Sequence, residues 1–73
     1  MAQVAKVIEL VGTSPTSWQD AVEAAVREAS KTIRHITGVD ILHTTADVEG
    51  DRITTWRVTV KIAFGIESER PPA

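Results

Sequence analysis

The segment 52–66 alternates apolar and polar residues more regularly than any other part of the chain. Alternation is typical of a β-strand, in which successive side chains point to opposite faces of the sheet. The apolar positions are Trp56, Val58, Val60, Ile62, Phe64 and Ile66, and the polar positions include Thr55, Arg57, Thr59 and Lys61. The pattern therefore predicts a long strand with one face in the core.

The segment 39–48 precedes this strand and predicts its hairpin partner. The two segments are joined by Glu49-Gly50-Asp51. Glycine at the tip of a short connection is typical of a β-hairpin, because it adopts the left-handed backbone that tight turns require. We therefore expect 39–48 and 52–66 to pair antiparallel.

The segment 4–11 is rich in β-branched residues and predicts another strand. Its alternation places Ile8 and Leu10 on one face and Val7 and Val11 on the other. A strand that is apolar on both faces is buried on both sides or lies at a subunit boundary. This strand therefore needs cover that a single helix cannot supply.

Between these strands, apolar residues recur at steps of three and four. They are Trp18, Val22, Ala25, Val26, Ala29, Ile33 and Ile36. This spacing places them on one face of a helix of about five turns. We expect the helix to end between His35 and Gly38.

Two serines compete for the start of this helix. Ser14 is the first candidate for the N-cap, because Pro15 after it suits the first helical position, where the missing N–H has no partner. Ser17 is a weaker candidate, since Asp20 stands where a capping box prefers Glu or Gln. We therefore expect the helix to begin after Ser14.

The predicted order is strand, helix, strand, strand: an α+β fold of β-α-β-β type, with a three-stranded antiparallel sheet wrapped around one helix. We expect one domain over residues 1–73, with an ordered core over about 4–66 and a flexible tail over 67–73. Because the helix returns the chain, the first strand should pair antiparallel with the last. One helix covers one sheet face, and a second copy of the chain is the simplest cover for the rest.

Composition excludes several classes of protein. The absence of cysteine removes disulfides, Cys-based zinc sites, iron–sulfur clusters and cysteine nucleophiles. A net charge of −2 argues against nucleic acid as a partner. No signal-peptide pattern and no apolar run of roughly 20 residues is present, so we expect no membrane partner and a soluble, cytoplasmic protein. A domain this small commonly gains stability by association.

No constellation of residues predicts catalysis. The hydroxyls of Ser14 and Ser17 are explained by helix capping. His35 and His43 are candidates for a general base, but neither has a partner nearby in the sequence that specifies one. We therefore do not expect an enzyme.

The hairpin carries a possible metal site. Asp47, Glu49 and Asp51 gather three carboxylates near its tip, and carboxylates are the ligands that calcium prefers. Their spacing does not match a known calcium loop, and charged hairpin tips also serve solubility. Both interpretations remain open.

The order of motifs resembles that of the dodecins. The first strand ends in Val-Ile-Glu-Leu-Val-Gly-Thr-Ser at Val7–Ser14. The helix region carries Ala-Ser-Lys-Thr-Ile-Arg-His-Ile at Ala29–Ile36, and the last strand carries Val-Lys-Ile-Ala-Phe at Val60–Phe64. The resemblance runs without obvious gaps over about 4–66. It implies a hollow homododecamer, which would cover the first strand on both faces.

The resemblance also implies a flavin site. Typical dodecins bind FMN or riboflavin in pairs near two-fold axes and store it, without redox catalysis. The positions that match the family's flavin-binding residues are Gly38, Thr45, Arg57 and Gly65. All four are substituted, since the family has a stacking tryptophan, an arginine, a glutamine and an arginine there. The site is therefore expected to be altered in this chain.

The same resemblance leaves an alternative. Divergent dodecins without the stacking tryptophan include members associated with calcium, and the Thr-Ser-Pro-Thr-Ser-Trp run at Thr13–Trp18 adds to the likeness. The alternative is a calcium-binding or purely structural dodecamer without flavin. The first expectation is a shell that stores a small ligand.

Overall fold

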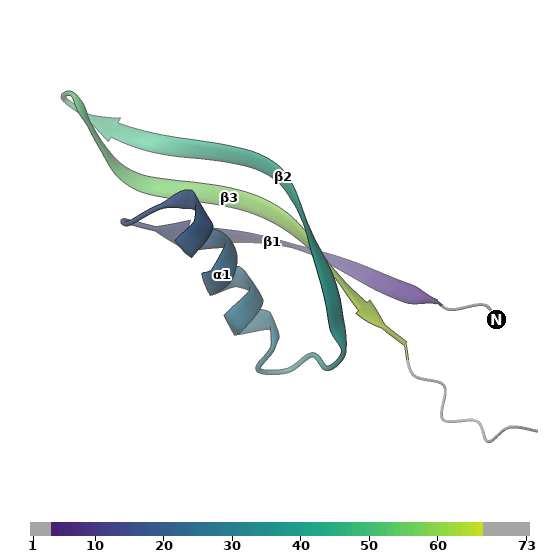
Figure 1. The fold of residues 1–73 in the computed structure, drawn as a ribbon. Helices are drawn as coiled ribbons and strands as arrows, with labels where there is room; N and C mark the ends of the chain where they lie inside the picture. The colour runs from purple at the N-terminus through teal and green to yellow at the C-terminus, as the bar shows by residue number, and fades with distance from the viewer. Residues whose placement is uncertain (1–3, 67–73) are drawn as a thin grey trace, which may run out of the picture.

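The computed structural model describes residues 4–66, which form one three-stranded sheet and one helix (Figure 1). The elements in chain order are β1 (Ala5–Ser14), α1 (Trp18–Ala29), β2 (Ile36–Glu49) and β3 (Arg52–Gly65). The predicted α+β fold of β-α-β-β type is confirmed. The predicted tail over 67–73 lies outside the described residues. Within 4–66 the helix is neither long enough nor apolar enough to cross a membrane.

The last strand of the chain is the central strand of the sheet. The strand order is β1-β3-β2, and both neighbours of β3 run antiparallel to it. β1 pairs with β3 without interruption, from Ala5 opposite Gly65 to Ser14 opposite Trp56. The predicted pairing of the first and last strands is therefore confirmed, and the strand with the most regular alternation is the one hydrogen-bonded on both edges.

The core lies between α1 and one face of the sheet. Val58, Val60 and Ile62 of β3 are fully buried beneath the helix. The buried residues of α1 are mostly alanines: Ala21, Val22, Ala25 and Ala29. Small side chains let the helix lie close to the strands, and burying each large aliphatic side chain of β3 contributes about 1.5–3 kcal/mol.

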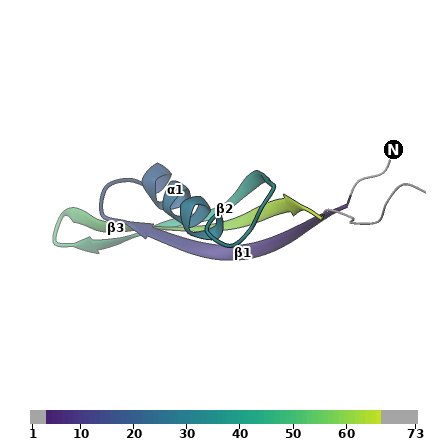
Figure 2. The same ribbon diagram turned by 90° about the horizontal axis from the view of Figure 1, so that it is seen from below.

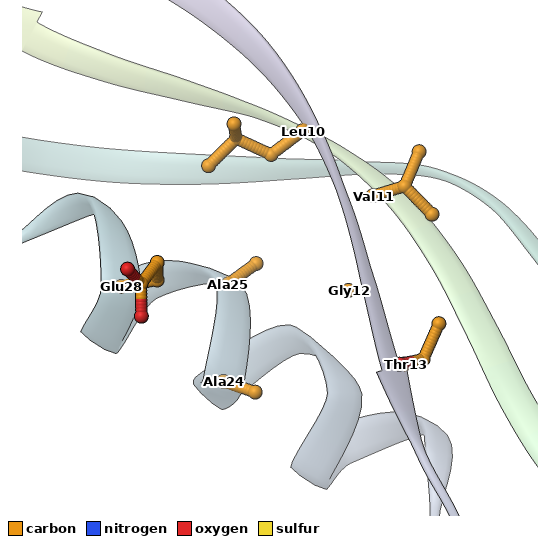
Figure 3. A pocket seen from close by; sticks show the side chains of 7 residues that line it. All are labelled: Leu10, Val11, Gly12, Thr13, Ala24, Ala25 and Glu28. Carbon is orange, nitrogen blue, oxygen red and sulfur yellow. The ribbon is translucent and has the colours of Figure 1, made fainter.

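The backbones of α1 and β1 lie very close together at Gly12. A Cβ atom at this position would overlap the carbonyl oxygen of Ala21 and lie 3.2 Å from the Cβ atom of Ala25. Figure 3 shows Ala25 facing this stretch of β1. Glycine is required at this position because a side chain would separate the helix from the strand.

The helix begins after Ser17, not after Ser14 as predicted. The Ser17 Oγ accepts a hydrogen bond from the backbone N–H of Asp20 at 3.0 Å. The Ser14 hydroxyl instead accepts from the backbone N–H of Thr16 at 2.9 Å and donates to the Asp20 carboxylate at 2.7 Å. Ser14 still supports the helix start, but it does so from the end of β1 because it is paired opposite Trp56.

The helix ends at Ala29, not between His35 and Gly38 as predicted. Ile33 and Ile36 nevertheless pack against the core. Their spacing in the sequence is therefore explained by burial and not by a continuation of the helix. β-Branched residues disfavour helix, and the chain must turn back here for β2 to run antiparallel to β3. His35 adopts a left-handed backbone with φ 63° at this reversal, and β2 starts at Ile36, three residues earlier than predicted.

The sheet face turned away from α1, which we call the outer face, is not covered by any element among residues 4–66. Figure 2 shows α1 on one side of the sheet only. On the helix side of β1, Ile8 and Leu10 pack against the core. On the outer face, Val7 and Val11 are 50% and 58% exposed. The prediction that the first strand is apolar on both faces is confirmed.

We predict that Gly12→Ala lowers the free energy of unfolding by about 1–3 kcal/mol, the usual cost of forcing extra atoms into a packed core. The added methyl group would displace the backbone of α1 at Ala21. Urea denaturation at a fixed protein concentration measures the change. Gly65→Ala is the matched control, because an added Cβ atom there meets no atom within 4 Å. Equal losses in both variants would contradict the prediction.

Candidate functional site

The outer face consists of cross-strand rows, each with one residue from β1, β3 and β2. Neighbours within a row have Cβ atoms about 4.5–5.5 Å apart and interact directly. From the hairpin end, the rows are Thr13, Arg57 and Thr45; Val11, Thr59 and His43; Glu9, Lys61 and Asp40; and Val7, Ala63 and Gly38. The outer face therefore combines exposed aliphatic side chains with charged groups of both signs.

The four predicted ligand positions all lie on the outer face, in two groups. Thr45 lies opposite Arg57, and its Oγ1 donates to the Arg57 carbonyl oxygen at 3.5 Å. Gly38 lies opposite Ala63. Ala63 is about 20 Å from Arg57 along β3, at the usual rise per residue of a strand. Gly65 follows two residues later, at the end of the sheet. Within one chain the two groups are too far apart for a single ring system to contact both.

An open depression of about 410 Å³ surrounds Gly38. Its lining residues are Val7, Gly38, Val39, Asp40, Lys61 and Ala63. A Cβ atom at Gly38 would meet no atom within 4 Å, so the strand has room for a large side chain here. The depression offers an apolar floor with one carboxylate and one ammonium group at its side.

At the other end of the outer face, Arg57 and Asp47 form a bidentate ion pair. The Nη1 and Nη2 atoms of Arg57 donate to Oδ1 and Oδ2 of Asp47 at 3.1 and 2.9 Å. The two side chains are 42% and 51% exposed. Hydrogen bonding by Arg57, and then its positive charge, lower the pKa of Asp47 below its usual value, and the same contacts raise the pKa of Arg57.

The three hairpin carboxylates do not form a metal site within one chain. No group of three His, Cys, Asp or Glu side chains among residues 4–66 is arranged to hold a metal ion. Asp47 is turned to Arg57, Glu49 lies opposite Arg52, and Asp51 stands in the turn after Gly50. A cation site that uses these residues stays a prediction and would need ligands from another copy.

The candidate catalytic hydroxyls and imidazoles lie apart from the depression. Ser14 and Ser17 both belong to the hydrogen-bonded start of α1. The carbonyl oxygen of His35 accepts from the N–H of Gly65 at 3.0 Å, and His43 is exposed on the outer face opposite Thr59. The structure does not bring these serines and histidines into one cluster.

A second hollow, of about 250 Å³, lies between β1 and α1 (Figure 3). Its lining residues are Leu10, Val11, Gly12, Thr13, Ala24, Ala25 and Glu28. These residues are mostly aliphatic or small, and Glu28 is the one charged residue among them. The hollow lacks the converging polar groups that orient a small ligand.

Comparison with known proteins identifies the family of this chain. Residues 4–67 match the sequence profile of the Dodecin family. The chain is 31% identical to the calcium dodecin of Mycobacterium tuberculosis over 68 residues, which cover 93% of this chain and 96% of the relative. It is 30% identical to the dodecin of Thermus thermophilus, over 92% of this chain and 97% of the relative. The chain belongs to the dodecin family.

Solved dodecin structures share the fold of this chain. The dodecin of Streptomyces coelicolor superposes with a TM-score of 0.84 at 31% identity, covering 92% of this chain and 96% of the other. A variant of the Thermus thermophilus dodecin in which a tryptophan is replaced by phenylalanine has a TM-score of 0.86 at 28% identity, and the match covers 92% of this chain and all of the other. The calcium dodecin of Mycobacterium tuberculosis, described as chelating calcium, superposes with a TM-score of 0.75 at 31% identity. The match covers 94% of this chain and 99% of the other. The resemblance seen in the motifs is confirmed.

The sequence offered Asp47 as one candidate ligand of a cation, and the pairing of Asp47 with Arg57 was not predicted. The signal was the opposite charge of two residues on adjoining strands, but the register of a hairpin decides whether such residues meet. Thr45 and Asp47 are two residues apart and therefore share a face of β2. With Thr45 opposite Arg57, Asp47 lies diagonally within reach of a long side chain.

We predict that Arg57→Gln raises the pKa of Asp47 toward its ordinary value, because the charge and the bidentate hydrogen bonds are lost. In the wild type, the stabilisation from this pair is fully present above the unfolded-state pKa of Asp47 and disappears as the pH falls through the lowered folded-state pKa. NMR titration of the Asp47 carboxyl group measures the shift. Arg27→Gln, on the last turn of α1, should leave it unchanged. An unaltered pKa in Arg57→Gln would exclude the pair in solution.

Proposed function

We propose that this dodecin assembles as a closed homododecameric shell that binds and stores a small ligand, and that it is not an enzyme. The observation that carries the proposal is the outer face, which has an open depression at Gly38 and is left uncovered by the described part of the chain. Exposed valines on this face favour association through burial of apolar surface. The free edges of β1 and β2 offer backbone groups for pairing with other copies.

The hairpin adds support for assembly. Val48 and Ile53 near its tip are 61% and 47% exposed. Figure 1 shows this end of β2 and β3 extending past the start of α1. Since the helix does not cover these side chains, contact with another copy is the simplest way to bury them.

The ligand class that best fits the proposal is a flavin, FMN or riboflavin. The support is family membership together with Gly38, which lines the depression and is the position that the motifs match to the family's stacking tryptophan. Stacking on an aromatic side chain contributes roughly 1–3 kcal/mol per ring in comparable nucleic-acid complexes. A site without it binds flavin more weakly than a site with tryptophan.

Light scattering tests the assembly. Twelve chains of 7.9 kDa give a particle of about 95 kDa. Val11→Asp should dissociate this particle into smaller species, because it places a charge in an apolar contact between copies. Glu9→Gln, on the same strand and the same face, is the control and should keep the mass of the wild type. A 7.9 kDa monomer of the wild type at micromolar concentration would contradict the shell.

Restoring the aromatic ring tests the ligand. Gly38→Trp should tighten the binding of riboflavin and FMN by about 5- to 150-fold, the equivalent of one stacking contact. Quenching of flavin fluorescence measures the affinity. Gly38→Leu adds bulk at the same open position without an aromatic ring, and its effect should be much smaller. Equal affinity in the wild type and Gly38→Trp would place the flavin site elsewhere or remove flavin from the proposal.

A calcium-binding or purely structural dodecamer is the second candidate. It is favoured by the 31% identity to the calcium dodecin of Mycobacterium tuberculosis and by the carboxylates at the hairpin. Since the described residues of one chain hold no cluster of three ligands, the cation would lie between copies. Calorimetric titration with calcium chloride that gives no heat and no rise in Tm would exclude calcium.

A further inference from the structure

The depression at Gly38 has a shallow apolar floor. Val7 of β1, Ala63 of β3 and Gly38 of β2 lie side by side in one row of the outer face. Glycine and alanine do not project far from the sheet, and Val7 is 50% exposed. The volume of about 410 Å³ falls within the range of about 300–1,000 Å³ that is usual for small-molecule sites. A floor of this shape and chemistry suits one face of a flat ring.

Two charged side chains lie beside this floor. Lys61 and Asp40 are opposite each other in the next row, and both line the depression. Both are exposed, and neither forms an ion pair or a side-chain hydrogen bond with any of residues 4–66. Arg57 and Asp47 differ in this respect, because their charged groups bind each other. The ammonium group of Lys61 and the carboxylate of Asp40 are therefore available to a ligand.

Together these two groups offer a ligand a hydrogen-bond donor next to an acceptor. An ammonium group only donates hydrogen bonds, and an ionised carboxylate only accepts them. Because residues opposite each other on antiparallel strands have Cβ atoms about 4.5–5.5 Å apart, both groups can reach neighbouring atoms on one edge of a ring. The edge that complements them carries a carbonyl oxygen next to an N–H group. A few polar groups beside an apolar floor are what fixes the orientation of a ligand in small-molecule sites.

We propose that Lys61 and Asp40 are specificity-determining residues of the depression, where they bind the carbonyl and N–H edge of a flat heterocycle. Lys61 donates to the carbonyl oxygen and Asp40 accepts from the N–H group, while the ring lies on Val7 and Ala63. The inference rests on the proposed function, in that the depression holds the stored ligand. Flavins belong to this class, because the N3–H group of their ring lies between two carbonyl groups, and so do the smaller lumazines.

Methylation of the ligand tests the contact with Asp40. Lumiflavin has the N3–H group, and 3-methyllumiflavin carries a methyl group in place of its hydrogen. We expect the methyl group to weaken binding to the wild type by about 3- to 10-fold, the equivalent of one partly exposed hydrogen bond. In Asp40→Ala the two ligands should bind with equal affinity. Equilibrium dialysis measures all four affinities, and an equal methyl effect in the wild type and Asp40→Ala would overturn the inference.

Glu9→Ala is the matched control, because Glu9 lies opposite Lys61 on its other side but does not line the depression. This variant should keep the methyl effect of the wild type. Loss of the effect in Glu9→Ala would assign it to net charge and overturn the role of Asp40. Lys61→Met removes the donor and should weaken the binding of both ligands by the same factor of about 3 to 10. Unchanged affinities in Lys61→Met would overturn the role of Lys61.

Other ligands separate this inference from the proposed function. By NMR, lumazine should shift the backbone amide resonance of Gly38 at a lower concentration than 3-methyllumazine, even if lumiflavin does not bind. Equal responses to the two lumazines, or none, overturn the inference, whereas light scattering decides independently whether the shell forms. Phenazine is a flat ring system without a carbonyl or N–H group. If it binds as tightly as lumiflavin, recognition of the edge is overturned, but the depression still serves as a storage site.

Discussion

Close packing of α1 against one face of the sheet is the contact on which the rest of the structure depends. At Gly12 the strand and helix backbones lie so near that no Cβ atom fits between them. The buried alanines of α1 have small side chains and so also allow the helix to lie close to the sheet. Beneath the helix, Val58, Val60 and Ile62 are fully excluded from water. Since this single helix supplies the core of a small domain, its position fixes which sheet face is structural and which is free.

The free face is where function is expected. Its residues are not part of the buried core cluster, so small, apolar and charged side chains can be arranged there with little loss of core packing. The depression at Gly38 and the ion pair at Arg57 occupy opposite ends of this face. Exposed Val7 and Val11 lie on the same face. Assembly and ligand binding are thus expected to use one surface, which links the stability of the shell to its contents.

A bulge in β3, in which Thr54 is the extra residue, determines which side chains meet at the ion pair. The register at the turn, if continued, would place Thr44 opposite Arg57. The irregularity between Asp47 and Val48 shifts the pairing by one residue and places Thr45 there instead. A shift of one residue exchanges the two faces of a strand. Asp47 therefore reaches the outer face only because of the bulge, and sequence periodicity could not have located it.

The sequence by itself determined the order of the elements, the core face of β3 and the apolar character of both faces of β1, because alternation and turn residues act locally along the chain. The family motifs predicted which positions match the ligand site of the family. The tertiary structure decided where α1 ends, which serine caps it and that Asp47 pairs with Arg57. Ile33 fits a helical stripe and also packs against the core outside a helix. Contacts between residues distant in the chain determine whether such a residue lies in a helix or in a loop.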